Sequence, residues 1–172
     1  FDGPRMPPQN IDAEISLLGS LLLEGEVINA VADSLREEDF YKKEHQIIFG
    51  AIISLFSSRK PVDVLSVSNI LKEKKKLEEI AGMSYLTSLV NSVPTSSNAS
   101  HYAEIVRKKK ILRDLISVSH DVSRLGYQEN EDVDSLLDEA EKKIFAIAQH
   151  SLIKGFTSVG SFLDEAWERI DN

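Results

Sequence analysis

Apolar residues recur three or four positions apart along most of the chain, the spacing that places them on one face of a helix. Residues 11–22 begin this pattern, with Ile11, Leu18 and Leu22 sharing a face. The same spacing returns in residues 27–35, 45–56, 64–71 and 83–90. Asp63 stands as a predicted N-cap before the fourth segment. Because no segment shows the alternation typical of a strand, the pattern predicts an all-α fold.

The second half of the chain predicts a helical hairpin. Residues 91–100, "NSVPTSSNAS", form a polar stretch that indicates a loop and a domain boundary. Two long helical segments follow, at about 100–125 and 132–149, joined by the polar turn "YQENED" after Gly126. Residues 1–6 are expected to hold a short sequence left over from expression, followed by the natural start at Met6. The rest is expected to form a compact helical head at 7–100, a long antiparallel hairpin at 101–150, and a linker with a partial helix at 151–172.

The two hairpin segments carry more apolar residues than one pairing can bury. The paired faces are predicted to hold Ile111, Leu115, Val118, Val122 and Leu125 on the first helix and Val133, Leu137, Ala140, Ile144 and Ile147 on the second. Leu112, Ile116, Leu136 and Phe145 lie off these faces. They either dock onto the head or meet another hairpin or a partner protein, and the sequence favours neither alternative.

The last residues, "FTSVGSFLDEAWERIDN", predict the beginning of an amphipathic helix capped by Ser161. Its apolar face carries Phe162, Leu163, Trp167 and Ile170, and Trp167 is the only tryptophan of the chain. A tryptophan side chain buries roughly 150–250 Å² when it is covered, so we expect another surface to pack on this face.

The composition excludes several kinds of chemistry. The chain has no cysteine, a formal net charge of −8 and no apolar run of 18 residues, which predicts a reducing cytoplasmic setting without a membrane span. No lysine precedes a serine or threonine, so the phosphate-binding loop of nucleotide hydrolases is absent from the sequence. The four histidines lack metal-ligand spacing, and His45 has only its helical neighbour Glu44 as a nearby carboxylate in the sequence. No catalytic residue, cofactor or metal is therefore predicted.

Charged runs allow one alternative function. "RKKKILR", residues 107–113, is the dense basic cluster on a helix, and it would suit direct binding of single-stranded nucleic acid. The competing interpretation is a solvated helix face, which the acidic net charge favours. The acidic turn "REED", residues 36–39, and the run "KEKKKLEEI", residues 72–80, are likewise interpreted as solvated.

Five motifs in order resemble the N-terminal domain of the bacterial DnaB-type replicative DNA helicases. They are "PPQNIDAEISLLGSLL", "DFYKKEHQIIFGAI", "KPVDVLSVSNIL", "AGMSYLTSLVNSVPTSSNASHYAEIV" and "DVDSLLDEAEKKIFAIA". Together they extend over nearly the whole chain from Pro7. One departure is Ala81, where the family usually has a second glycine, and it affects the local turn.

The resemblance implies a non-catalytic collar domain of a hexameric helicase. In that family hairpins pair between subunits, which suits Leu112, Ile116, Leu136 and Phe145, and the collar forms from dimers or trimers. The C-terminal domain of a DnaG-type primase docks on the collar, near Tyr85, Ile116 and Val122 by this resemblance; a helicase loader is a further implied partner.

The remaining implications concern what lies beyond these residues. The linker helix would dock Phe162, Leu163, Trp167 and Ile170 on a neighbouring motor domain. ATP and Mg²⁺ belong to that motor domain, and DNA would be contacted only through the full ring at the bacterial replication fork.

Overall fold

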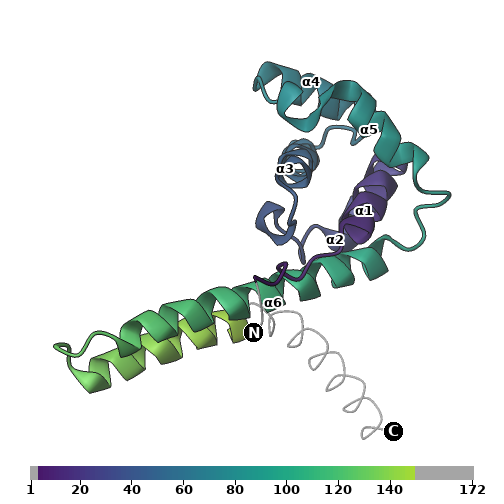
Figure 1. Ribbon diagram of the computed structural model, residues 1–172. Coiled ribbons are helices and arrows are strands. Elements are labelled where there is room, and N and C mark those ends of the chain that lie inside the picture. The colour runs from purple at the N-terminus through teal and green to yellow at the C-terminus, as the bar shows by residue number, and fades with distance from the viewer. Residues whose placement is uncertain (1–3, 150–172) are drawn as a thin grey trace, which may run out of the picture. The chain divides into compact units, whose positions relative to one another are not determined.

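The computed structural model describes residues 4–149, and within this range every regular element is a helix. The predicted all-α class is confirmed (Figure 1). The chain divides into two compact units that meet at Lys110 and Ile111, inside one long helix. We call the first unit the head and the second the hairpin, and describe each by itself.

The helices follow one another closely in the head. Their bounds are α1 (Ile11–Leu23), η1 (Gly25–Val27), α2 (Ile28–Val31), η2 (Glu37–Asp39), α3 (Lys43–Ser57), α4 (Val64–Glu73), η3 (Glu78–Ile80), α5 (Gly82–Asn91) and α6 (Ala99–Gly126), where η marks 3₁₀ turns. The predicted helix over 27–35 is shorter than expected, since only α2 is α-helical there. Ile28, Val31 and Leu35 are nevertheless buried, so packing rather than helix length holds this segment.

The head core forms where α1 packs against α5 and α3. Asn10 caps α1 by accepting a hydrogen bond from the Ala13 amide. Asp63 caps α4 by accepting from the Ser66 amide, as predicted. The largest fully buried side chains include Leu17, Leu18, Phe49, Ile52 and Leu86. Their periodic spacing in the sequence is the reason that these helices form and face one another.

Within residues 4–110, three residues of the head other than glycine have left-handed backbone, Arg59, Lys75 and Ala81. Lys75 ends α4 with φ 57°, and the following Lys76 amide donates to the Leu71 carbonyl at 2.8 Å. Ala81 has φ 67° and precedes Gly82, which has φ 76°. A side chain with a Cβ costs roughly 1–2 kcal/mol in this conformation, a cost that glycine avoids.

Replacing Ala81 with glycine is expected to raise the free energy of unfolding by about 1 kcal/mol, because glycine adopts this φ without strain. Urea denaturation followed by circular dichroism measures the change. Gly82→Ala is the opposite variant: its Cβ would meet no atom within 4 Å, so any loss of stability reports the backbone alone. An Ala81→Gly variant that is less stable than the parent would contradict this account of the turn.

The first turns of α6 belong to the head. Ala99, Ala103 and Val106 are buried in its core. Arg107 is also buried, and its Nη1 donates to the Ser34 carbonyl at 3.0 Å. The unit boundary therefore falls within α6 and not in the polar loop before it.

The hairpin pairs the rest of α6 with a helix at residues 133–149 (Figure 1). Leu125 is buried, whereas Leu136 is half-buried. Asp121 on α6 forms an ion pair with Lys143 of the other helix at 3.7 Å. The hydrogen bond from Arg124 lowers the pKa of Asp121, with the positive charges of Arg124 and Lys143 acting in the same direction.

The predicted pairing of the second hairpin helix agrees only partly with the burial of its residues. Val133 and Leu137, predicted on the paired face, line a hollow together with side chains of α6, although both are exposed. Ile144 and, on α6, Leu115 are exposed as well, because two helices alone leave the margins of a wide apolar face open to solvent. Leu136 was expected to lie outside the pairing, but it is half-buried and lines the same hollow.

Candidate interaction surfaces

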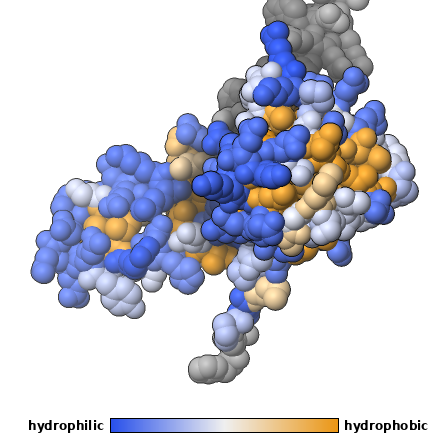
Figure 2. Space-filling model, turned by 90° about the horizontal axis from the view of Figure 1, so that it is seen from above, coloured by the Kyte–Doolittle hydropathy of each residue, from blue (hydrophilic) through white to orange (hydrophobic). Residues whose placement is uncertain are grey.

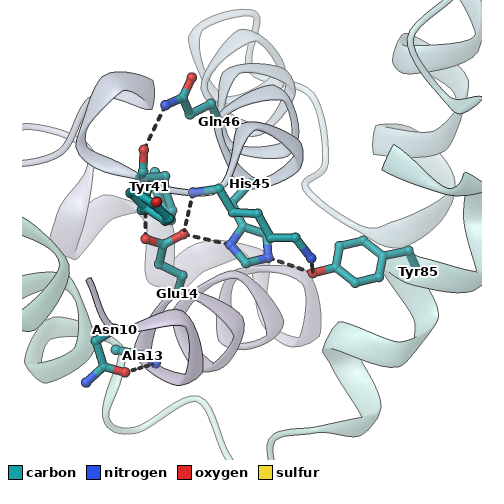
Figure 3. A network of polar contacts seen from close by, with 9 residues as sticks. Asn10, Ala13, Glu14, Tyr41, His45, Gln46 and Tyr85 are labelled. Carbon is teal, nitrogen blue, oxygen red and sulfur yellow. Dashed lines mark hydrogen bonds and ion pairs between the residues drawn. The ribbon is translucent and has the colours of Figure 1, made fainter. Parts of the chain in front are cut away.

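A buried polar network connects three helices of the head (Figure 3). Glu14 comes from α1, His45 from α3 and Tyr85 from α5. The His45 Nδ1 lies 2.7 Å from Glu14 Oε1, and its Nε2 lies 2.6 Å from the Tyr85 hydroxyl. Glu14 is 2% exposed and His45 is fully buried, so both polar groups depend on these contacts to replace water.

Backbone donors complete the surroundings of the Glu14 carboxylate. The Tyr41 amide donates to its Oε2 at 2.8 Å, and the Lys42 amide donates to its Oε1 at 3.3 Å. A carboxylate accepts only, so the Nδ1–H of His45 donates to Glu14 and, for a neutral ring, Nε2 accepts from Tyr85. The network assigns this tautomer.

Tyr85 is the half-buried end of the network. The Lys42 Nζ lies 3.5 Å from the Tyr85 hydroxyl and 5.0 Å from the ring centroid. The Lys42 cation and the hydrogen bond between the Tyr85 hydroxyl and His45 together hold the Tyr85 ring in one orientation. The sequence interpretation missed this site, because it considered Glu44 beside His45 and not Glu14, 31 positions earlier.

The described residues offer no set of three or more histidine, cysteine or acidic side chains that could hold a metal. The turn "REED" is only partly solvated: Asp39 is buried, and its carboxylate accepts from the Arg36 amide at 2.8 Å. Asp39 therefore has a structural role in capping η2.

The hairpin carries exposed apolar side chains. Leu112 and Ile116 on α6 are exposed, and so is Phe145 on the second helix. Ile144, Phe145 and Ala148 line a hollow of about 570 Å³ with polar neighbours around it. Figure 2 shows apolar side chains between hydrophilic ones on this unit. Such a patch on a helix pair is typical of a protein interface.

The residues implied in primase docking occupy different settings. Tyr85 lies in the head, whereas Ile116 and Val122 lie in the hairpin. Ile116 is exposed, but Val122 is half-buried and lines a hollow between the hairpin helices with Leu125. The linker-helix residues Phe162, Leu163, Trp167 and Ile170 lie outside the described residues.

The basic cluster at 107–113 does not form a uniform basic face. Arg107 is buried and bonded to the Ser34 carbonyl, and Lys109, Lys110 and Arg113 are half-buried. Lys108 is the exposed cation of the group. This arrangement weakens the direct nucleic-acid interpretation, which needs several cations along one groove.

Residues 4–149 thus form an all-helical head followed by an antiparallel hairpin with exposed apolar side chains. The chain matches the family model "DnaB-like helicase N terminal domain" over residues 6–108, and it belongs to that family. No helix in residues 4–149 has the length and apolar character needed to cross a membrane.

Similar proteins agree with this assignment. The chain is 38% identical over 167 residues to the replicative DNA helicase DnaC of Bacillus subtilis, and 36% identical to DnaB of Geobacillus stearothermophilus. Both matches cover 97% of this chain but 37% of the relative, so the chain spans little more than a third of their length.

Two solved structures share the fold. The N-terminal domain of DnaB helicase from Mycobacterium tuberculosis superposes with a TM-score of 0.78 at 37% identity, covering 83% of this chain and 99% of that one. A DnaB-like replicative helicase, described with its interactions with primase, has a TM-score of 0.68 at 25% identity. That match covers 88% of this chain and 35% of the other.

Proposed function

We propose that this domain forms part of the N-terminal collar of a hexameric replicative helicase, where it joins subunits and docks primase. The observation that carries the proposal is the exposure of three apolar side chains on the hairpin, Leu112, Ile116 and Phe145. In this proposal ATP and Mg²⁺ bind a motor domain that follows in the parent protein, and DNA is contacted only by the complete ring.

Self-association would bury the same hairpin surface on both partners. In a twofold dimer each patch meets its own copy, so one apolar surface is sufficient for a symmetric contact. Pairs of hairpins could then close into a ring of three dimers. Six tethered domains would hold docked primase at high effective concentration near the DNA.

Ile116→Asp is expected to weaken self-association of the chain at least tenfold, because it places a charge where an apolar side chain would be buried. Light scattering at several protein concentrations measures the change in mass. Asn130→Asp is the control, because it adds the same charge at an exposed position of the turn between the hairpin helices. A parent chain that stays monomeric at high concentration, or an Ile116→Asp variant with unchanged mass, would count against the proposal.

Primase docking is supported by the solved helicase whose description names its interactions with primase. Tyr85 is oriented by His45 and Lys42 before any partner arrives, which reduces the entropy lost on binding. We therefore expect Tyr85→Ala to weaken binding of a primase C-terminal domain about tenfold, as measured by calorimetry. Tyr127→Ala is the control, since Tyr127 is exposed at the end of α6. Equal affinities of the Tyr85→Ala and Tyr127→Ala variants for the primase domain would show that Tyr85 is not part of the docking site.

The second candidate function is binding of single-stranded DNA by residues 107–113, although Lys108 is the one exposed cation of this cluster. A gel-shift titration separates the two functions. Binding at physiological salt that weakens steeply as salt is added would replace the interaction proposal, whereas we expect no shift.

A further inference from the structure

The head has an open groove that the proposed function does not use. It runs along α4, past η3 to the start of α5, and encloses about 600 Å³. Leu65, Leu77 and Met83 supply its apolar side chains. Leu65 is 61% exposed and Met83 is 45% exposed, although both belong to a well-packed head. Figure 2 looks down on α4 and α5 and shows apolar side chains open to solvent beside hydrophilic ones.

Lysines concentrate at this groove although the chain as a whole is acidic. Lys72 and Lys75 line it, together with one acidic residue, Glu78. Lys74 and Lys76 of the same run line a second hollow of about 240 Å³, which Lys43 and Glu37 also border. Residues 72–80 hold four lysines and three glutamates, so this stretch has a net charge of +1 within a chain of net charge −8.

Lys75 occupies a position that favours glycine. Its φ of 57° lies in the left-handed region, where a side chain is tolerated at a conformational cost. The reversal there needs a residue that accepts this φ, and nothing in its backbone hydrogen bonding needs a lysine side chain. The same backbone motif occurs at Arg59, so the distinguishing feature of Lys75 is that its side chain lines the groove.

We propose that the α4–α5 groove binds an acidic protein segment that carries two or three bulky apolar side chains. The apolar residues of such a segment would cover Leu65, Leu77 and Met83, and its carboxylates would meet Lys72 and Lys75. Mixed apolar and basic lining favours this partner over a nucleic acid, because none of the residues that line the groove is an aromatic platform for base stacking. The groove residues are different from those proposed for subunit contacts and primase docking.

The test uses the 172-residue chain and a fluorescein-labelled 12-residue peptide as the probe. The peptide has Leu or Phe at helical positions i, i+3, i+4 and i+7 and Glu elsewhere; a second peptide has Gln in place of Glu. Fluorescence anisotropy is expected to give a Kd on the order of 10–100 µM for the acidic peptide, and binding at least fivefold weaker for its neutral counterpart. Equal affinity for both peptides would overturn the assignment of the lysines.

Lys75→Gly is the decisive variant, since it removes the lysine side chain and also removes the conformational cost of positive φ at this residue. We expect it to weaken peptide binding about threefold or more without lowering the midpoint of urea denaturation. Arg59→Gly is the matched control, because Arg59 also has positive φ, 56°, carries the same charge and does not line the groove. If both variants bind like the parent chain, or both lose affinity equally, the groove is not the binding site.

Leu65→Ser tests the apolar part of the groove and, at 61% exposure, does not disturb the core. We expect at least a threefold loss of peptide affinity and unchanged self-association by light scattering. Reduced self-association in Leu65→Ser would instead make the groove a contact between copies of this chain. Displacement of the peptide by a 12-nucleotide oligothymidine would make it a polyanion site, and either result would overturn the proposal. Failure of the groove variants leaves the hairpin proposal unchanged, because Ile116→Asp tests that surface separately.

Discussion

Replacing Gly19 with alanine is expected to lower the free energy of unfolding by about 2–3 kcal/mol, because α1 and α5 pack with their backbones in contact at this residue. A Cβ on Gly19 would overlap the carbonyl oxygen of Leu89 and come 3.1 Å from the Val93 Cγ2. The carbonyl belongs to the backbone of α5 and cannot rotate away, so one helix has to move. Urea denaturation followed by circular dichroism measures the loss.

Gly50→Ala is the matched control, since Gly50 also lies inside a helix of the head, α3. Its added Cβ would meet only the carboxylate end of the exposed Glu37 side chain, which can turn into solvent. Alanine also has a higher helix propensity than glycine, by about 1 kcal/mol. We therefore expect Gly50→Ala to be neutral or stabilising. Equal losses for the two variants would show that close helix packing at Gly19 is not the cause.

Glu14→Gln is the other change with a large expected effect, a loss of about 2–4 kcal/mol in the free energy of unfolding. The Glu14 carboxylate accepts from the Tyr41 amide, the Lys42 amide and His45, whereas a glutamine side chain has one acceptor oxygen and one donor group. In either orientation, its amide group faces a buried donor. The variant therefore leaves at least one buried polar group without its hydrogen bond.

Glu44→Gln provides the comparison for this prediction. The substitution removes the same charge as Glu14→Gln, one position before His45. Glu44 is half-exposed and takes no part in the network. Its substitution is expected to change the unfolding free energy by less than about 0.5 kcal/mol. If Glu14→Gln and Glu44→Gln are equally stable, the buried network contributes nothing specific to the head.

The helical segments were predictable because their apolar spacing and their caps are local properties of the sequence. Asp63 illustrates this, since it caps the helix that begins directly after it. The partner of His45 was not predictable in the same way. Glu14 is 31 positions away, and only the packing of α1 against α3 brings the two side chains together.

The hairpin shows a second limit of reasoning from spacing. Leu112, Ile116 and Phe145 are exposed, but so are residues of the predicted paired faces, so exposure does not separate the two groups. Leu136 and Leu137 line the same hollow, and Leu136 is the more covered of the two. Which leucine is covered depends on the shapes of the facing side chains, which periodicity does not record.

The position of the unit boundary inside α6 has a consequence for exchanging parts between related helicases. A cut in the polar loop would remove Ala99, Ala103 and Val106 from the head and would leave the carbonyl of Ser34 without Arg107. A chimaera of two relatives should therefore be joined after Lys110, in the middle of α6, without adding or removing a residue, so that the helical register continues across the joint. One residue added at that joint would rotate everything after it by about 100° around the helix axis. The head and the hairpin pack separately but share one helical register. Natural recombination and protein engineering must both preserve that register.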